Sequence, residues 1–185
     1  MGNKAEITGY INFTGTSSNK IFNSIIGYYT EVINKGAFTD SLLNYGKPIM
    51  TLNHNKDIVI SNENNLELIE DDLGLKFIAK TDNVEAIYCA LNDRFKGCSF
   101  TFKALKQSYN LIGDEAIREV EKLKLIEVTL ISDDKKPMYP LSTINVMYVP
   151  DDLMKKVNEY KNDPLRVCKE KAKALNDKYG QEELR

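Results

Sequence analysis

Residues 125–131 read Leu-Ile-Glu-Val-Thr-Leu-Ile. β-Branched residues are frequent in this run and helix-capping residues are few, which predicts a strand within residues 117–131. Residues 114–122, at its start, are also compatible with a helix. Glu127 stands out, because burying a carboxylate among apolar neighbours costs several kcal/mol unless it has a partner. A solvent-facing glutamate on a strand with one buried face is the simpler explanation of this pattern alone.

A second predicted strand lies earlier in the chain and ends at its single histidine. The stretch is extended over residues 48–54, beginning at a proline. Alternation along this strand would place Met50, Leu52 and His54 on one face, so that the imidazole lies at the end of an apolar row. A single histidine is most often a polar surface residue, and its position alone does not assign it a role.

A third predicted strand begins beside Gly97, which ends a helix expected over residues 82–94 with Asp82 as its cap. Alternation over residues 98–102 puts Cys98 and the two phenylalanines on one face. Ser99 therefore opens this strand on the opposite face. A serine near a glycine is common, so this residue too needs its context.

The C-terminal part of the chain is predicted to be helical. One helix is expected from Asp151, and another from Asp163, where an aspartate cap precedes a first-turn proline; Gly180 would end it. The apolar residues of the second helix step by three and four positions and form a narrow stripe, suited to packing on the body or on a partner helix. The stripe consists of Leu165, Cys168, Ala172, Leu175 and Tyr179.

Charge and composition exclude several classes of protein. The 25 Lys and Arg against 27 Asp and Glu leave a net charge of −2, which provides no field to attract DNA. The three cysteines have no CxxC spacing, and one histidine cannot complete a usual zinc site. No apolar run approaches the length of a membrane span or of a signal peptide. We expect an intracellular protein with no metal and no cofactor, which binds neither nucleic acid nor membrane.

Four short segments, taken together and in this order, resemble the prohead serine proteases of tailed phages, a family distantly similar to the herpesvirus assemblins. The segments are residues 31–38 with Gly-Ala-Phe, the histidine strand 49–54, the nucleophile strand 97–102, and the arginine-led strand 118–131. The likeness spans residues 7–146. The family usually has Asp where this chain has Asn55, and commonly Gly where it has Thr101.

The resemblance implies an α+β fold in which a small, mostly antiparallel β-barrel, like that of the herpesvirus proteases, is flanked by helices. Residues 1–150 would form this catalytic domain and residues 151–185 a helical tail. It also implies that His54, Ser99 and Glu127 are the catalytic residues.

The chemistry of these three residue types is consistent with that role. A serine hydroxyl is a poor nucleophile until a base removes its proton, and an imidazole, with a reference pKa of about 6.5, suits this task at neutral pH. As the only histidine, His54 would be the base for Ser99. Glu127 would accept the other ring N–H, which would give the carboxylate the partner that its apolar neighbours lack.

The resemblance implies a serine endopeptidase that cleaves scaffolding segments and the leader of the major capsid protein, inside the assembling prohead in the host cytoplasm. Self-cleavage and a homodimer are compatible with it. One alternative is a noncatalytic scaffold or shell-binding protein that keeps the fold and uses its tail helices as the working surface. Another makes Cys98 the nucleophile, but alternation turns this residue away from the face of Ser99.

Overall fold

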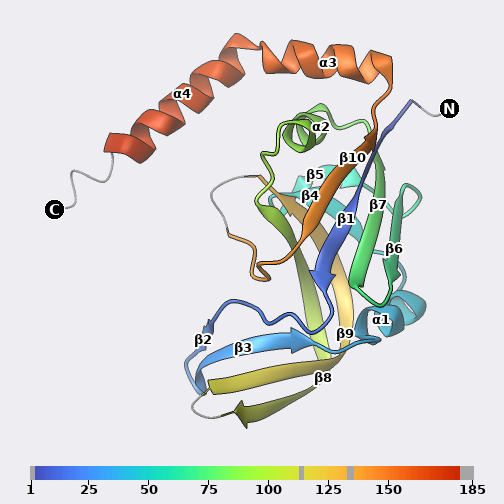
Figure 1. The fold of residues 1–185 in the computed structure, drawn as a ribbon, viewed down its shortest axis with the longest axis vertical. Helices are drawn as coiled ribbons and strands as arrows, with labels where there is room; N and C mark the ends of the chain where they lie inside the picture. The colour runs from blue at the N-terminus through green and yellow to red at the C-terminus, as the bar shows by residue number, and fades with distance from the viewer. Residues whose placement is uncertain (1–2, 113–114, 133–135, 180–185) are drawn as a thin grey trace.

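Strands make up most of the regular structure in the computed structural model, which describes residues 3–112, 115–132 and 136–179 (Figure 1). For residues 112 and 176–179 it describes the backbone alone. Within these ranges the chain forms ten strands and four helices. The predicted α+β class is therefore confirmed.

One sheet has four strands, all paired antiparallel. They are β1 (Ala5–Phe13), β6 (Leu66–Glu70), β7 (Gly74–Thr81) and β10 (Thr143–Tyr148). Their order across the sheet is β10-β1-β7-β6. The first strand of the chain therefore lies in the interior of this sheet, between β10 and β7.

The second sheet is organised around its longest strand, β9. Its members are β2 (Ile21–Asn23), β3 (Gly27–Ile33), β4 (Ile49–Leu52), β5 (Asn55–Ser61), β8 (Gly97–Ile112) and β9 (Glu115–Ile131). β8 runs antiparallel to β9 along one edge, whereas β3 and β4 both lie parallel to β9 on the other edge. β2 and β5 pair with β3 and β4 as antiparallel outer strands.

The predicted barrel is not confirmed, since the described strands form two open sheets. A barrel closes only when its last strand pairs with its first. Here β3 and β4 pair with residues 116–120 and 127–130 of the same edge of β9, so the second sheet forks at this strand. The preponderance of antiparallel pairing was predicted correctly, because among the described pairs only β3·β9 and β4·β9 are parallel.

Hydrophobic side chains of the two sheets meet in one large core, which α1 (Ala37–Tyr45) covers at one end. Ile7 and Phe77 reach it from the first sheet, and Met50 and Leu130 from the second. Each is completely buried. The fold is thus a two-layer packing in which each sheet presents one apolar face to the other.

β9 confirms the strand predicted at its C-terminal end, and the helical alternative for residues 115–122 is wrong. The strand carries a bulge: Thr101 and Phe102 of β8 lie opposite Glu127 and Leu125, so that Ile126 is an extra residue. A one-residue bulge reverses the faces on which the following side chains lie. The core residues of β9 are accordingly Leu123 and Leu125 before the bulge, and Val128 and Leu130 after it.

The reversal of faces at the bulge turns Glu127 and Thr129 away from the core, although Glu127 is only two residues from the buried Leu125. Without the extra residue, strict alternation would place the carboxylate among the core side chains. The bulge therefore resolves the conflict between the glutamate and its apolar neighbours in the sequence.

The helices begin and end close to the predicted residues. α2 (Val84–Leu91) is shorter than the predicted 82–94, and its cap is Asn83, whose side-chain oxygen accepts the N–H of Ala86 at 2.9 Å. Asp82 was therefore the wrong choice by one residue.

The tail consists of the two predicted helices, α3 (Asp151–Lys161) and α4 (Pro164–Tyr179), while Gly180 lies outside the described residues. α3 packs on α2 through Leu153 and Val157. α4 reaches outward from the body beyond α2 (Figure 1). In the described ranges, no helix combines the length and apolar character needed to cross a membrane.

Candidate active site

His54 lies in the two-residue turn between β4 and β5, whereas the sequence predicted the end of a straight strand. Leu52 pairs with Asn55, and the two residues between them, Asn53 and His54, have φ angles of 55° and 59°. Positive φ at both central positions is typical of the type I′ turn, whose twist suits a β-hairpin. Residues with a Cβ atom rarely adopt it, so the surroundings must hold His54 in place.

Hydrogen bonds to β9 hold this turn over the polar face of the sheet. The backbone N–H of His54 donates to Oγ1 of Thr129 at 3.0 Å, and the same hydroxyl donates to the carbonyl oxygen of Thr51 at 3.0 Å. The side chain of Asn53 in turn accepts the backbone N–H of Ser132 at 2.7 Å. The turn is thereby fixed to the C-terminal end of β9.

The imidazole of His54 contacts Glu127 directly. Its Nδ1 lies 2.9 Å from Oε2 of the carboxylate. The His54 side chain is 34% exposed and that of Glu127 7%, so one end of this pair is accessible and the other is enclosed. With an ionised carboxylate, Nδ1 carries the shared proton and Nε2 is left as the acceptor nitrogen of the ring.

Two threonine hydroxyls complete the surroundings of Glu127. Thr51 donates to Oε1 at 2.7 Å, and Thr101 of β8 donates to Oε2 at 3.3 Å. Burial would raise the pKa of the Glu127 carboxyl, but the hydrogen bond and the charge of His54, together with the hydrogen bonds of Thr51 and Thr101, hold this pKa below its ordinary value. Glu127 is therefore a buried anion with partners, and a simple solvent-facing position is excluded.

Ser99 lies on the same face of the sheet. It pairs with Thr129 across β8 and β9, and Thr129 pairs with Thr51 on the other side. Directly paired residues of neighbouring strands point to one side of a sheet, so Ser99 lies beside the residue whose hydroxyl holds the His54 turn. Ser99 is half-buried. In the described part of the chain its hydroxyl makes no hydrogen bond. Of the three candidate catalytic residues, His54 and Glu127 are therefore the two that are in direct contact.

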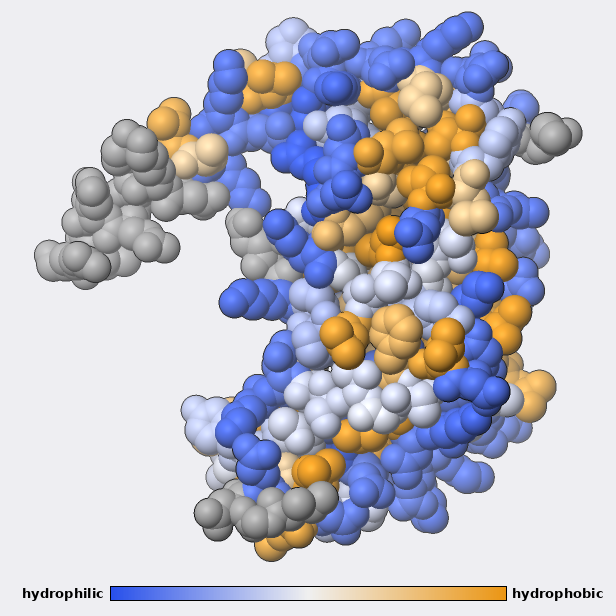
Figure 2. Space-filling model, in the orientation of Figure 1, coloured by the Kyte–Doolittle hydropathy of each residue, from blue (hydrophilic) through white to orange (hydrophobic). Residues whose placement is uncertain are grey.

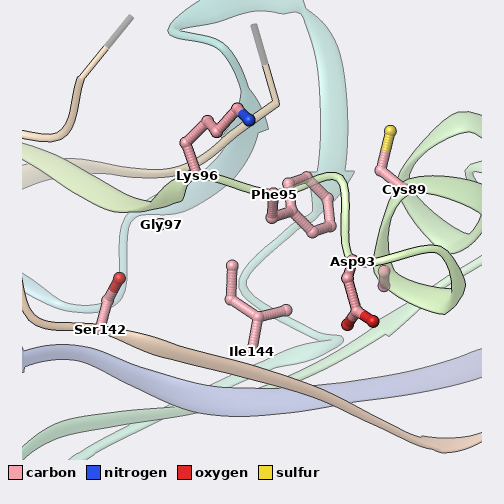
Figure 3. A pocket seen from close by; sticks show the side chains of 8 residues that line it. Cys89, Asp93, Phe95, Lys96, Gly97, Ser142 and Ile144 are labelled. Carbon is pink, nitrogen blue, oxygen red and sulfur yellow. The ribbon is translucent and has the colours of Figure 1, made fainter.

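A pocket of about 140 Å³ adjoins the start of β8, two residues before Ser99. Figure 3 shows Asp93, Phe95 and Ile144 around it, with Gly97 and Ser142 on the side of β8. A Cβ atom at Gly97 would approach Oγ of Ser142 to 2.7 Å. The same hydroxyl accepts the N–H of the next residue of β8 at 3.0 Å. Glycine thus allows the close approach that fixes this end of the strand.

The thiols of Cys89, which lines this pocket, and of Cys98, which lies in the core, are unsuited to nucleophilic attack. Burial raises the pKa of Cys98 to about 12, and burial followed by the charge of Glu85 raises that of Cys89 to about 11. A thiol must ionise to become a strong nucleophile. Cys98 is also completely buried in the core. This burial supports the orientation that strand alternation predicted for it.

The sequence analysis missed the role of the three threonines. Thr129 follows Glu127 by two residues, Thr101 follows Ser99 by two, and Thr51 precedes His54 by three. The period of two along a strand could have placed the first two on the faces of their catalytic candidates. Their hydrogen bonds to Glu127 and to the turn required the pairing of β4, β8 and β9, which the sequence did not show.

Comparison with known proteins adds to this geometry. Residues 1–157 match the family described as caudovirus prohead serine protease. The chain belongs to this family. The matched region includes all three candidate residues and ends within α3. No curated protein matches the sequence.

Family membership confirms the resemblance stated from the four sequence segments. It makes the chain a member of a serine peptidase family and supports a role in capsid maturation. The match ends at residue 157, before α4 begins at Pro164. The family assignment therefore gives no information on the second tail helix.

Proposed function

We propose that this protein is a serine endopeptidase of prohead maturation in which Ser99 is the nucleophile, His54 the general base and Glu127 the residue that orients the imidazole. The observation that carries the proposal is the 2.9 Å contact of His54 Nδ1 with a buried carboxylate. Ser99 belongs to the same sheet face, opposite Thr129.

In this mechanism Nε2 of His54 removes the proton of Ser99 as its Oγ attacks a peptide carbonyl. The imidazolium that forms is stabilised by the negative charge of Glu127 at the other ring nitrogen. The proton then passes to the leaving amine as the peptide bond breaks, and a water molecule attacks the acyl-enzyme in the same way. Thr51 and Thr101 keep the carboxylate ionised and directed at the ring.

The substrates in this proposal are scaffolding segments and the leader of the major capsid protein, cleaved inside the assembling prohead in the host cytoplasm. Residues 1–150 act as the catalytic domain, and residues 151–185 form the tail. Self-cleavage and a homodimer are further parts of the hypothesis. Family membership supports the capsid-maturation role in general, and mapping the new termini of cleaved proteins would identify the individual substrates.

The decisive experiment co-expresses the chain with the capsid and scaffolding proteins of its phage. Ser99→Ala should abolish cleavage and leave the fold intact, because only a half-buried hydroxyl is lost, which has no hydrogen-bond partner among the described residues. The matched control is Cys98→Ala, which changes the neighbouring residue and should remain active. If gels showed cleavage by Ser99→Ala and none by Cys98→Ala, the nucleophile would be Cys98. Unchanged cleavage by both variants would place the reaction elsewhere.

The noncatalytic alternative is less favoured, because the matched family is one of peptidases. A scaffold or shell-binding protein would have no need of an ionised, buried carboxylate at the ring of its single histidine. It predicts that the unaltered chain and Ser99→Ala give the same protein pattern, which the same experiment tests.

A further inference from the structure

The first four residues of the apolar stripe of α4, from Leu165 to Leu175, face solvent and do not pack on the body. Leu165 is 73% exposed and Leu175 56%, and Cys168 and Ala172 between them are exposed as well. Figure 2 shows apolar residues along this part of the tail, surrounded by hydrophilic ones. Of the two possibilities left open by the sequence, packing on the body is therefore wrong for these four residues.

The opposite side of α4 is attached to the body, and this fixes the direction of the stripe. Glu170 accepts from Arg94 at 2.6 Å and pairs with Arg166 at 2.7 Å. The Arg166 guanidinium lies 4.7 Å from the ring centre of Tyr88 and 5.5 Å from that of Tyr160. With 3.6 residues per turn, Glu170 lies across the helix from the stripe. These contacts hold the stripe outward.

The charge of α4 restricts what can cover the stripe. Five basic and two acidic residues give the helix a net charge of +3, in a chain whose total is −2. Lys169 and Lys171 flank the stripe, one on each side. Neither takes part in any ion pair of the described residues. A partner helix would therefore meet positive charge along both margins of its apolar contact.

We infer that α4 is a docking helix for an acidic amphipathic helix of another protein. Glutamate or aspartate beside the partner's own apolar stripe would pair with Lys169 and Lys171. A second copy of this chain fits poorly, because the positions that flank the stripe in α4 include lysines and no carboxylate that could pair with them. An anionic membrane is a poorer fit than a helix, because Cys168 and Ala172 in the middle of the stripe would bury little apolar area in lipid. The same small side chains allow a facing helix to approach closely.

The test measures binding by the full chain carrying Ser99→Ala, so that cleavage cannot remove the probe. The probe is a fluorescent helical peptide whose heptads carry Leu at both core positions and Glu at both flanking positions; a second peptide carries Lys in place of Glu. We expect the Glu peptide to bind and the Lys peptide not to bind. Because the readout is binding, its result is independent of the proposed proteolysis.

Two variants test the surface itself. Lys169→Glu with Lys171→Glu should weaken binding of the Glu peptide about ten-fold or more, since attraction is replaced by repulsion at two positions. The matched control is Lys155→Glu with Lys156→Glu, which makes the same charge change on exposed residues of α3 and should bind normally. Leu165→Gln with Leu175→Gln should also lose binding.

Three outcomes would overturn the inference. They are equal binding of the Glu and Lys peptides, equal weakening by the α3 control, and binding of anionic phosphatidylglycerol vesicles without binding of the Glu peptide. A fourth contrary result would be concentration-dependent self-association of the chain that Leu165→Gln with Leu175→Gln abolishes, which would assign the stripe to a second copy instead.

Discussion

Two glutamates of the second sheet are buried, and their partners differ in kind. Glu31 on β3 is 3% exposed and Glu127 on β9 is 6% exposed. Glu31 accepts from Arg118 at 2.5 Å and from the hydroxyl of Tyr139 at 2.6 Å. Glu127 is held instead by an imidazole and two threonine hydroxyls.

This difference separates a structural carboxylate from a chemically active one. A guanidinium keeps its charge at all ordinary pH values, so the Glu31 pair is fixed. Burial and Glu31 also raise the pKa of Tyr139, which remains a hydrogen-bond donor. An imidazole, by contrast, can gain and lose a proton near neutral pH. The environment of Glu127 therefore permits a change of charge at its partner, and that of Glu31 does not.

The largest expected effect on stability is at Glu31. Glu31→Gln leaves the Arg118 guanidinium without its counterion in a mostly buried position, and removing one partner of such a pair costs about 3 kcal/mol. Urea unfolding would measure the loss. Cleavage by the folded variant should be nearly normal. A large loss of cleavage in fully folded Glu31→Gln would show that the two carboxylates do not differ in the proposed way.

Glu127→Gln should show the opposite behaviour. Its amide keeps the size of the side chain but removes the negative charge and favours the wrong tautomer of His54, so cleavage should fall about a hundred-fold or more. Stability should change little, because a buried amide costs less than a buried charge. Cleavage rate and thermal unfolding of one preparation measure both. Normal cleavage by this variant would remove Glu127 from the catalytic residues.

The hydroxyls around Glu127 should have smaller effects, ranked by their distances. Thr51→Val keeps the shape of the side chain and removes the 2.7 Å bond, which should lower cleavage about ten-fold. Thr101→Val removes a longer bond of 3.3 Å and should lower it only about two- to three-fold. Single-turnover cleavage by the two variants provides the comparison. Equal cleavage rates of Thr51→Val and Thr101→Val would mean that these hydroxyls do not act through the carboxylate.

Local sequence patterns predicted several elements well. Periodicity and capping residues predicted α3 and α4, because these signals depend on neighbours within a few residues. The family segments led to His54, Ser99 and Glu127, whose arrangement the structure now makes testable. The cap of α2 was misplaced by one residue, since Asp82 and Asn83 are both good caps and only the backbone geometry distinguishes them.

The sequence by itself determined the family, the α+β class and the residues worth testing. The order of motifs and the hydrophobic period can be recognised along the chain without knowing which strands pair. Only the tertiary structure decided where the side chains of Glu127 and His54 lie. The extra residue Ile126 reverses the faces along β9, and it is recognised only against its partner strand β8. The I′ turn directs His54 onto Thr129 and Glu127, which are 75 and 73 residues away along the chain. Contacts over such separations depend on strand pairing, and no local pattern specifies them.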